Sequence, residues 1–400
     1  MVMIIQKFGG TSVATSKSRK AVLHKVSNAI QEGEQPIVVV SAMGRIGEPY
    51  ATDTLLQFVG ENAGEMTPRE HDLLLSCGEI ISAVTMATLL NENGIKARAF
   101  TGGQAGIITD NNFAQAELLY TEPKLLLQCV EEGVVPVVAG FQGITIDGQI
   151  TTIGRGGSDT TAAMVGSSIR ASRIEIYTDV DGIMTADPRI CEKAHIIDNI
   201  SYNEIFQMAD SGAKVIHPRA VEFAMRANIP LVIKNTFTDA PGTYIAQDVA
   251  DPNYQSPNPH KIITGIAHKN NRVQYTIEEP IMGEIDLLYE IAQESISMDM
   301  VNIFRMMKVF TIDASDQEKL EKLLTKFGYE FSKVTGCAKL TSIGQRMTGI
   351  PGIMAKIIRC LTKENINVMQ TADSLTTIAC LIPEDDLTKA ICSLHQEFGI

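Results

Sequence analysis

The first 245 or so residues alternate between short apolar runs and longer segments with helical spacing. The runs are rich in β-branched residues and lack period-2 alternation, as at 37–40, 134–138, 174–177 and 230–233. Such runs, separated by helices, are typical of a mainly parallel sheet buried on both faces. The pattern predicts an α/β fold with a three-layer, mainly parallel open sheet. Helices are expected near residues 18–30, 77–93, 159–169 and 221–227.

One segment departs from this pattern. Residues 144–153 alternate between apolar and polar positions on either side of Asp147-Gly148. An Asp-Gly pair between two alternating arms predicts a β-hairpin. The hairpin directly precedes a glycine-rich loop, where it is placed to act as a flap.

The carboxy-terminal part contains an internal repeat. Clustered Pro, Asn and Asp residues before it mark a domain boundary. We therefore expect a first domain at 1–245, a linker at 246–260 and two further domains at 261–334 and 335–400. The stretch that begins at Met282-Gly283 resembles the one that begins at Pro351-Gly352. Each copy is expected to run strand, helix, strand, strand, helix, strand, the ferredoxin-like order.

Composition and charge narrow the function classes. The 400 residues include 34 Lys and Arg against 47 Asp and Glu, a formal charge of −13. Such a surface disfavours binding to nucleic acid or anionic lipid. We find no apolar run that approaches the roughly 18 residues needed to span a bilayer. The seven cysteines are scattered, without a C-x-x-C pair, so the sequence favours a reducing, cytoplasmic location.

Three glycine-containing loops follow predicted strands, at Lys7–Ser12, Ser41–Gly44 and Gly154–Asp159. Backbone N–H groups beside an ammonium form a site for phosphate oxygens. Taken alone, the Lys7–Ser12 loop is more simply interpreted as a tight turn with a surface lysine. Three loops at strand ends of one open sheet, however, are expected to converge on a ligand. The chain has no P-loop signature, and Asp159 replaces the third glycine of a dinucleotide fingerprint.

Charged residues near these loops are candidates for chemistry. Asp159 is expected at a helix amino end, where the dipole favours its charge; the simpler interpretation is a helix N-cap. Arg155 offers a planar fork for a carboxylate, or is a solvated loop residue. Glu79 is expected in the first turn of a helix, as a buried working carboxylate.

A second polar cluster spans Tyr177–Arg189. Its carboxylates and arginine suit a ribose and base, or a metal, although Asp-Gly and Asp-Pro also favour simple turns. Lys214 and His217 are further candidates for contacts to phosphate. For His217 a structural role is the better interpretation.

Taken together, these motifs resemble aspartokinase, a member of the amino-acid-kinase superfamily. The resemblance rests on Lys7–Ser12, Val40–Gly44, Gly140–Gly143, Gly154–Asp159 and Tyr177–Gly182, in this order. The two repeats resemble the tandem ACT domains of feedback-regulated members. The resemblance implies ATP-dependent phosphorylation of the β-carboxylate of L-aspartate to 4-phospho-L-aspartate, the first step towards lysine and diaminopimelate, threonine and methionine. The alternatives are another amino-acid kinase, such as a glutamate 5-kinase, and a catalytically silent amino-acid sensor.

The resemblance also implies residue roles. Lys7 and Asp159 would be catalytic. The aspartate site would comprise Ser41, Thr52, Glu79, Arg155 and Ser158. The ATP site would comprise Lys7, Gly9, Gly10, Ser12, Tyr177, Thr178, Asp179, Asp181, Met184, Arg189 and Lys214. Mg²⁺ would be held mainly through the nucleotide phosphates, without a metal site of its own.

Regulation is implied in the same way. Diaminopimelate, lysine or threonine would bind the first ACT domain, and the ACT domains would mediate self-association. The effector site would comprise Met282, Gly283, Met298 and Asp299. The loop at residues 45–51, longer than in many relatives, resembles that of the diaminopimelate-sensitive isozymes.

Overall fold

The computed structural model describes residues 2–60, 66–213, 216–247, 262–278, 286–345, 347 and 351–400. These residues form two compact units. The first unit comprises residues up to 183 together with 196–209 and 214–257, and the second comprises 184–195, 210–213 and 258–400. The predicted linker lies almost entirely outside the described residues. The second unit therefore includes two short segments from the range predicted as the first domain.

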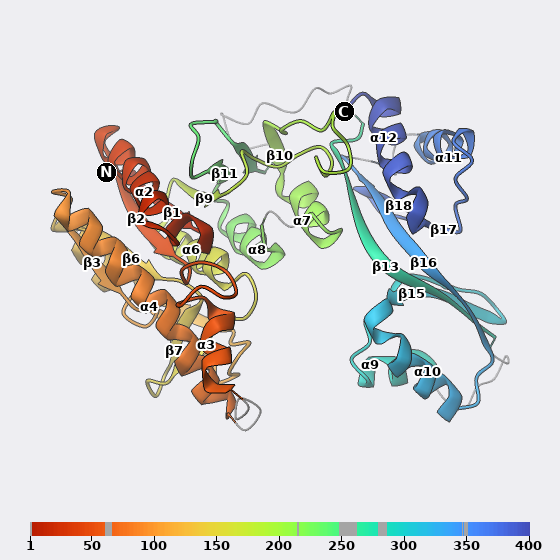
Figure 1. Ribbon diagram of the computed structural model, residues 1–400, viewed down its shortest axis with the longest axis horizontal. Coiled ribbons are helices and arrows are strands. Elements are labelled where there is room, and N and C mark those ends of the chain that lie inside the picture. The colour runs from red at the N-terminus through yellow and green to blue at the C-terminus, as the bar shows by residue number, and fades with distance from the viewer. Residues whose placement is uncertain are drawn as a thin grey trace. The chain divides into compact units, whose positions relative to one another are not determined.

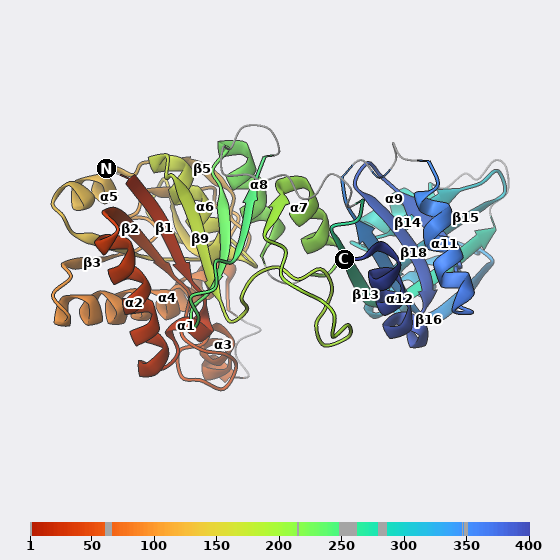
Figure 2. The ribbon, with the colours of Figure 1, turned by 90° about the horizontal axis from the view of Figure 1, so that it is seen from above.

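The first unit is built on an eight-stranded sheet in the order β10-β12-β11-β9-β1-β2-β6-β3. Its neighbouring strands are parallel except for β11 and β12. Figure 2 shows β2, β1 and β9 side by side, in the middle of this sheet. The strands are β1 (Val2–Phe8), β2 (Glu34–Val40), β3 (Ala97–Phe100), β6 (Val135–Ala139), β9 (Arg173–Thr178), β10 (Asn199–Ser201), β11 (Leu231–Asn235) and β12 (Thr243–Ala246).

Side-chain alternation along β1 assigns the two faces of this sheet. Phe8 packs in a core cluster with residues of α2 and α4. Ile5, on the opposite face, lies against Gly166 of α6. Lys7 shares the face of Ile5 and therefore points towards α6. Helices on both faces confirm the predicted three-layer fold. The helices are α1 (Gly10–Val13), α2 (Ser16–Gln31), α3 (Thr52–Val59), α4 (Pro68–Glu92), α5 (Lys124–Glu131), α6 (Gly157–Ile169), α7 (Tyr202–Asp210) and α8 (Pro218–Ala227).

The predicted hairpin is present, as β7 (Gln142–Thr145) and β8 (Ile150–Thr152). It does not stand alone as a flap. It joins β4 (Ile107–Thr109) and β5 (Leu118–Thr121) in a second sheet, ordered β5-β4-β7-β8. Pairing of β4 with β7 holds the hairpin in place.

Helix α4 is long and apolar enough to cross a membrane, by length and composition alone. The sequence argument that no segment approaches such a span therefore does not hold for this helix. Half of its most apolar window is buried inside the molecule. Asp72 and Glu79 are among its buried residues. Buried carboxylates and core packing against the sheet indicate an internal helix.

The second unit contains a six-stranded antiparallel sheet in the order β14-β15-β13-β16-β18-β17. Figure 1 shows its two long central strands, β13 and β16, running from α9 and α10 at one end to α11 and α12 at the other. The elements are β13 (Gly265–Glu278), α9 (Leu287–Gln293), β14 (Asp299–Ile303), β15 (Met307–Asp313), α10 (Gln317–Lys326), β16 (Phe331–Ile343), α11 (Ile353–Lys363), β17 (Gln370–Asp373), β18 (Thr377–Pro383) and α12 (Leu387–Phe398).

The two repeats share these central strands. The first half of β13 pairs with the second half of β16, beside the strands of the second repeat. Register shifts between Lys269 and Gln274 mark the change from one repeat to the other. The expected last strand of the second copy is therefore not found after α12. The start of β13 occupies its place, and the predicted boundary at 334/335 falls inside β16.

The segment 184–195 packs within the second unit. Ala186 and Cys191 belong to its hydrophobic core. The Thr185 carbonyl accepts a hydrogen bond from the Ile266 N–H (2.7 Å). The Thr185 hydroxyl lies 2.9 Å from His395 Nε2. This part of the chain, which immediately follows the Tyr177–Gly182 motif, is thus held by the carboxy-terminal unit.

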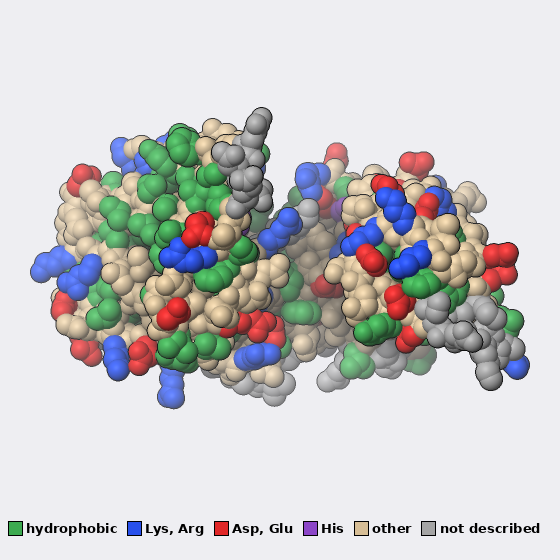
Figure 3. Space-filling model, turned by 90° about the horizontal axis from the view of Figure 1, so that it is seen from below, with side chains coloured by type: hydrophobic (Ala, Val, Ile, Leu, Met, Phe, Trp, Pro, Cys, Tyr) green, Lys and Arg blue, Asp and Glu red, His purple; other side chains and the backbone are tan. Residues whose placement is uncertain are grey.

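The surface of both units mixes charges of both signs. In the view of Figure 3, basic and acidic side chains are interspersed, and hydrophobic side chains gather on one face of the first unit. Negative charge is in excess over the whole chain. A site for anionic reactants must therefore concentrate its positive charge locally.

Candidate active site

One pocket in the first unit gathers the predicted loops. It has a volume of about 280 Å³. The loops after β1 and β2 leave the carboxyl ends of neighbouring parallel strands, which meet at one edge of the main sheet. The loop after β8 reaches the same pocket from the second sheet, not from the main sheet as expected. The lining residues are Lys7, Gly10, Ser41, Ala42, Gly44, Thr52, Glu79, Phe141, Gly154, Arg155, Gly156, Gly157, Ser158 and Asp159. Eight of them were predicted from sequence as site residues: Lys7, Gly10, Ser41, Thr52, Glu79, Arg155, Ser158 and Asp159.

The centre of the pocket is an ion pair between Lys7 and Asp159. Lys7 Nζ lies 2.5 Å from Asp159 Oδ1, and the two side chains are 11% and 14% exposed. Asp159 stands in the first turn of α6, where the helix dipole favours its charge. The Lys7 ammonium therefore lines the pocket and is largely shielded from water.

Two glycines of the pocket are required by their surroundings. A Cβ atom at Gly10 would lie 2.8 Å from the Ala42 carbonyl oxygen and 2.9 Å from that of Gly44. The Gly10 carbonyl also accepts the Gly44 N–H (3.1 Å). Gly156 has a φ of +67°, and a Cβ there would lie 2.2 Å from His217 Cγ. The loops after β1 and β2 are thus packed backbone to backbone.

Glu79 is almost completely buried, with 3% of its surface exposed. One carboxylate oxygen accepts the Ala42 N–H (3.1 Å). The other, Oε2, has no hydrogen-bond partner among the described residues. Burial raises the pKa of Glu79 to about 8, although the Ala42 hydrogen bond opposes the shift. Glu79 lies in the middle of α4, not in a first turn, because the helix begins at Pro68.

Arg155 and Ser158 also line the pocket. Arg155 is exposed, and among the described residues no carboxylate is paired with it. Ser158 is buried against Gly140. Ser41, after β2, and Thr52, at the start of α3, add to the lining. The pocket therefore contains both a buried carboxylate, Glu79, and an exposed guanidinium, Arg155.

The other predicted nucleotide residues of the first unit lie outside this lining. The Gly9 N–H donates to the Tyr177 carbonyl (3.3 Å). The Ser12 hydroxyl is buried and lies 2.7 Å from the Thr236 hydroxyl. Tyr177 itself is buried: its ring stacks on Phe8, with centroids 4.7 Å apart, and its hydroxyl donates to Glu175 (3.0 Å). Its side chain is thus committed to the core, which leaves only its backbone for a ligand.

The loop after β9 holds the remaining candidates of this unit. Thr178 ends the strand, and the Thr178 hydroxyl donates to Asp179 (3.2 Å). Asp179 forms an exposed ion pair with Arg45 (3.1 Å). Asp181 accepts hydrogen bonds from Asn235 Nδ2 (2.8 Å) and the Thr238 hydroxyl (2.6 Å). These contacts order the loop.

Two predicted nucleotide residues that the structure describes belong to the second unit. Met184 and Arg189 pack with the second unit. Arg189 forms a forked pair with Asp187, with Nη2 2.7 Å from Oδ2, and this hydrogen bonding lowers the pKa of Asp187. Lys214 lies outside the described residues.

The predicted effector residues are described only in part. Met282 and Gly283 lie outside the described residues. Met298 is half-buried against the core of the first repeat. Asp299 pairs with Lys339 (2.6 Å) and accepts the Met300 N–H (2.8 Å). Burial opposes its ionisation, but these contacts outweigh burial and lower the pKa of Asp299.

Sequence reasoning assigned no role to Ala42 or Phe141, which also line the pocket. Ala42 acts through its backbone, which carries no sequence signature. Phe141 has a φ of +69°, and its N–H donates to the Thr161 hydroxyl (3.0 Å). The glycines on either side of the Phe141-Gln142 pair were the available signal for this tight passage.

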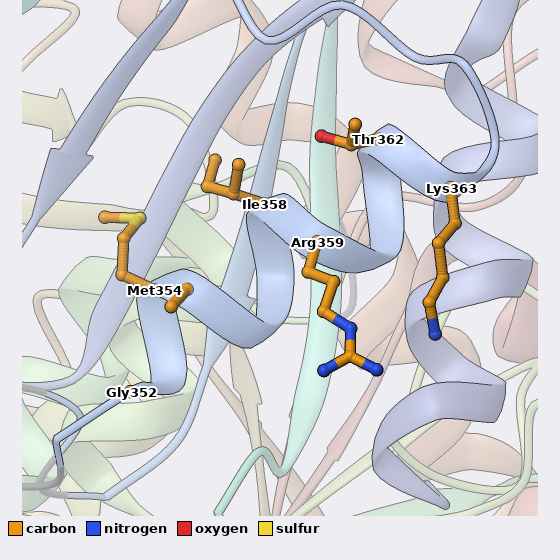
Figure 4. A pocket seen from close by; sticks show the side chains of 7 residues that line it. Gly352, Met354, Ile358, Arg359, Thr362 and Lys363 are labelled. Atoms are coloured by element: carbon orange, nitrogen blue, oxygen red, sulfur yellow. The ribbon is translucent and has the colours of Figure 1, made fainter.

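A larger pocket of about 830 Å³ lies in the second unit and differs in chemistry. Every lining residue comes from α11 or the glycine before it. Figure 4 shows Met354 and Ile358 on one flank of the helix and Arg359 and Lys363 on the other. It presents an apolar helix face without a carboxylate. The residues predicted to be catalytic, Lys7 and Asp159, line the smaller pocket of the first unit.

Comparison with known proteins agrees with this geometry. The amino acid kinase family model matches residues 2–235, and an ACT domain model matches residues 333–396. Aspartokinase 1 of Bacillus subtilis is 42% identical over 404 residues, covering all of both chains. The aspartokinase of Geobacillus stearothermophilus is 35% identical, covering all of this chain and 98% of its own.

Solved structures show the same relationship. Escherichia coli aspartokinase III, in complex with aspartate and ADP, is 25% identical with a TM-score of 0.79 over the whole of both chains. The aspartate kinase of Clostridium acetobutylicum has the same identity and TM-score, over 99% of this chain and all of its own. Together with the Lys7 pocket, these matches show that the chain belongs to the aspartokinase family and is an aspartate kinase.

Proposed function

We propose that the pocket around Lys7 transfers the γ-phosphoryl group of ATP to the β-carboxylate of L-aspartate, giving 4-phospho-L-aspartate. A carboxylate oxygen attacks the γ-phosphorus while the bond to the bridging oxygen breaks and ADP leaves. The nucleophile is already ionised near neutral pH, so no general base is required. The barrier is electrostatic, because two anions must meet.

In this proposal, Lys7 lowers the electrostatic barrier. Its ammonium, held by Asp159, stabilises charge on the transferring phosphoryl group. The amino end of α6 and the backbone of the Gly9-Gly10 turn supply further positive potential. The observation that carries the proposal is the buried 2.5 Å pair of Lys7 and Asp159 inside the same pocket as Glu79 and Arg155.

The two ends of the aspartate backbone have complementary partners. Glu79 Oε2, which has no partner among the described residues, suits the α-ammonium. The exposed Arg155 guanidinium suits the α-carboxylate. Ser41, Thr52 and Ser158 add hydroxyl groups along the lining. This arrangement leaves the β-carboxylate free to face Lys7.

In the first unit, ATP would extend from Gly9, Gly10 and Ser12 towards the backbone of Tyr177 and towards Thr178, Asp179 and Asp181. The assignment of Met184, Arg189 and Lys214 to the nucleotide rests on the sequence motif alone. Among the described residues, no group of three or more His, Cys, Asp or Glu side chains is placed to hold a metal ion. Ser158 and Asp159 are hard oxygen donors, which suit a Mg²⁺ that takes its other ligands from phosphate and water. Mg²⁺ would offset charge on the nucleotide.

A hydroxamate assay on the purified full chain tests the substrate. Aspartate, glutamate and N-acetylglutamate are offered in turn with ATP and Mg²⁺. We expect product with aspartate, and none or very little with the other two. A strong preference for glutamate would support the alternative amino-acid kinase, and a folded chain without turnover would support the silent sensor.

We further propose feedback regulation through the second unit, as part of a pathway to lysine and diaminopimelate, threonine and methionine. E. coli aspartokinase III has been solved in complex with lysine and aspartate. In this chain the effector would bind near Met282, Gly283, Met298 and Asp299. An effector ammonium would compete with Lys339 for Asp299. Initial rates with lysine, threonine and diaminopimelate, singly and in pairs, identify the effector, and flat rates at millimolar concentrations would remove the proposal.

Self-association is supported by the β14–β15 edge. This sheet edge exposes five large hydrophobic residues, each at least 41% accessible: Val301, Ile303, Phe304, Met306 and Met307. An apolar, unpaired edge favours pairing with another chain. We therefore propose that a second copy covers it.

We also propose a cytoplasmic location. All seven cysteines are free thiols, as a reducing compartment would leave them.

A further inference from the structure

A buried carboxylate outside the pocket ties two of its walls together. Asp72 lies in α4, two turns before Glu79, and is 0% exposed. Its oxygens accept the Ala114 N–H (2.9 and 3.0 Å), the Thr152 N–H (2.7 Å) and the Thr152 hydroxyl (2.7 Å). Asp72 thus joins the helix of Glu79 to the end of β8.

The residues that Asp72 holds lead directly into the substrate loop. Thr152 is the last residue of β8, and Gly154, two positions later, already lines the pocket. The residue between them is fixed from the other side, since Arg219 of α8 donates to the Ile153 carbonyl (2.9 Å). The start of the loop that carries Arg155 is therefore clamped between α4 and α8.

We propose that Asp72 is a positioning residue that sets the separation between Glu79 and Arg155, and with it the fit of the aspartate backbone. This inference rests on the proposed roles of those two residues. Glu79 and Arg155 come from different elements, and Asp72 links the two elements directly. A second tie, from Gln142 Nε2 of β7 to the Ser76 carbonyl of α4 (3.0 Å), would remain without Asp72, but it does not reach the end of β8 that leads to Arg155.

The bonding pattern suits a carboxylate at this position. Every neighbour within hydrogen-bonding distance of Asp72 can donate: two backbone N–H groups and one hydroxyl. His71 Nδ1 lies farther away, at 3.6 Å. Asparagine could keep both N–H bonds through its oxygen and donate its NH₂ group to the Thr152 hydroxyl, which can also accept. Asp72→Ala is therefore the variant that removes the link.

The test compares Michaelis constants of full-length variants in the aspartate kinase reaction. Asp72→Ala is expected to raise KM for aspartate roughly tenfold or more, because small misplacements of binding groups are costly. The KM for ATP should stay within about twofold, because the link lies on the aspartate side. Thr152→Val, which removes only the hydroxyl, should raise KM for aspartate less, and Thr152→Ser should restore it.

The matched control is Glu204→Ala. Glu204 is also a 0% exposed carboxylate of the first unit, and it accepts the Ser201 N–H (3.1 Å) and hydroxyl (2.6 Å). Neither residue lines the pocket. We expect this variant to lose thermal stability and keep both Michaelis constants. A purely structural Asp72 would behave in the same way, so an unchanged KM for aspartate in a folded Asp72→Ala enzyme overturns the inference. If Asp72→Ala does not fold, Thr152→Val decides by the same measure.

Glu79→Gln separates this inference from the proposed function. If Glu79→Gln leaves KM for aspartate unchanged, the role of Glu79 is wrong and the inference falls with it. If Glu79→Gln raises KM for aspartate but Asp72→Ala does not, the aspartate site stands and only the positioning role of Asp72 is overturned.

Discussion

Lys7 on β1 and Asp159 on α6 are 152 positions apart in sequence, yet their side chains form a 2.5 Å ion pair inside the pocket. Each charge is largely removed from water, so each depends on the other. Loss of one partner leaves the other buried and uncompensated. Catalysis and local stability are therefore coupled at this point.

The first prediction concerns the ammonium. Lys7→Ala is expected to lower kcat by roughly 10²–10⁴, about 3–5 kcal/mol of barrier, because charge on the transferring phosphoryl group loses its nearest cation. Steady-state kinetics in the hydroxamate assay measure the change, and circular dichroism checks that the variant is folded. Turnover unchanged by Lys7→Ala would remove Lys7 from the mechanism.

A second prediction follows from the raised pKa of Glu79. Below pH 8 most of the free enzyme carries Glu79 as a neutral acid, which cannot pair with an ammonium. The KM for aspartate should therefore fall about tenfold per pH unit as pH rises towards 8, and then level off. The measurement is KM between pH 6 and 8.5, where the substrate ammonium stays charged.

The control for this titration is Glu79→Gln. Its KM for aspartate should be high and independent of pH, because the titrating group is gone. If the wild-type enzyme and this variant show the same pH dependence, some other group titrates and the assignment to Glu79 fails.

The convergence of the loops could be predicted from sequence, whereas the contacts that fix them could not. Lys7, Gly10, Arg155 and Asp159 each follow a recognisable strand and glycine signal. Parallel strands explain why the loops after β1 and β2 meet, whereas the loop of Arg155 and Asp159 comes from the second sheet. Asp72 has no such signal, because its partners are mostly backbone N–H groups. Every residue except proline carries a backbone N–H, so residue identity does not show which of these groups will bond to a buried carboxylate.

The strand pairing of the second unit also could be predicted only in part from the sequence. The repeat predicted two ferredoxin-like domains, and the strands of both are present. Sharing of β13 and β16 could not be predicted, because strand pairing between residues about 70 positions apart has no local pattern. Tyr177 illustrates a third case: its ring stacks on Phe8 and its hydroxyl donates to Glu175, contacts that the motif around it did not predict.

A third prediction compares two glycines with positive φ. Gly156→Ala and Gly148→Ala both force a side chain into the left-handed region, at +67° and +87°, which costs about 1–2 kcal/mol. Only at Gly156 would the new Cβ collide, with His217; around Gly148 there is open space. We expect both variants to lose similar backbone stability, but only Gly156→Ala to lose aspartate binding.

Thermal denaturation and KM for aspartate measure the two effects separately. Gly148 lies at the tip of the hairpin, outside the pocket lining, so its variant should retain both Michaelis constants. If Gly156→Ala matches Gly148→Ala in every parameter, the packing of His217 on this loop has no part in substrate binding.

The last prediction concerns the apolar edge of the second unit. Ile303 and Phe304, at the end of β14, are 63% and 55% exposed. A charge placed there would be desolvated in any interface that covers the edge, so Phe304→Asp should shift the chain towards a lower mass in light scattering. Ile146, 76% exposed in the β7–β8 turn, provides the control: Ile146→Asp should leave the mass unchanged. Were Phe304→Asp to keep the wild-type mass at all concentrations, self-association would have to use another surface.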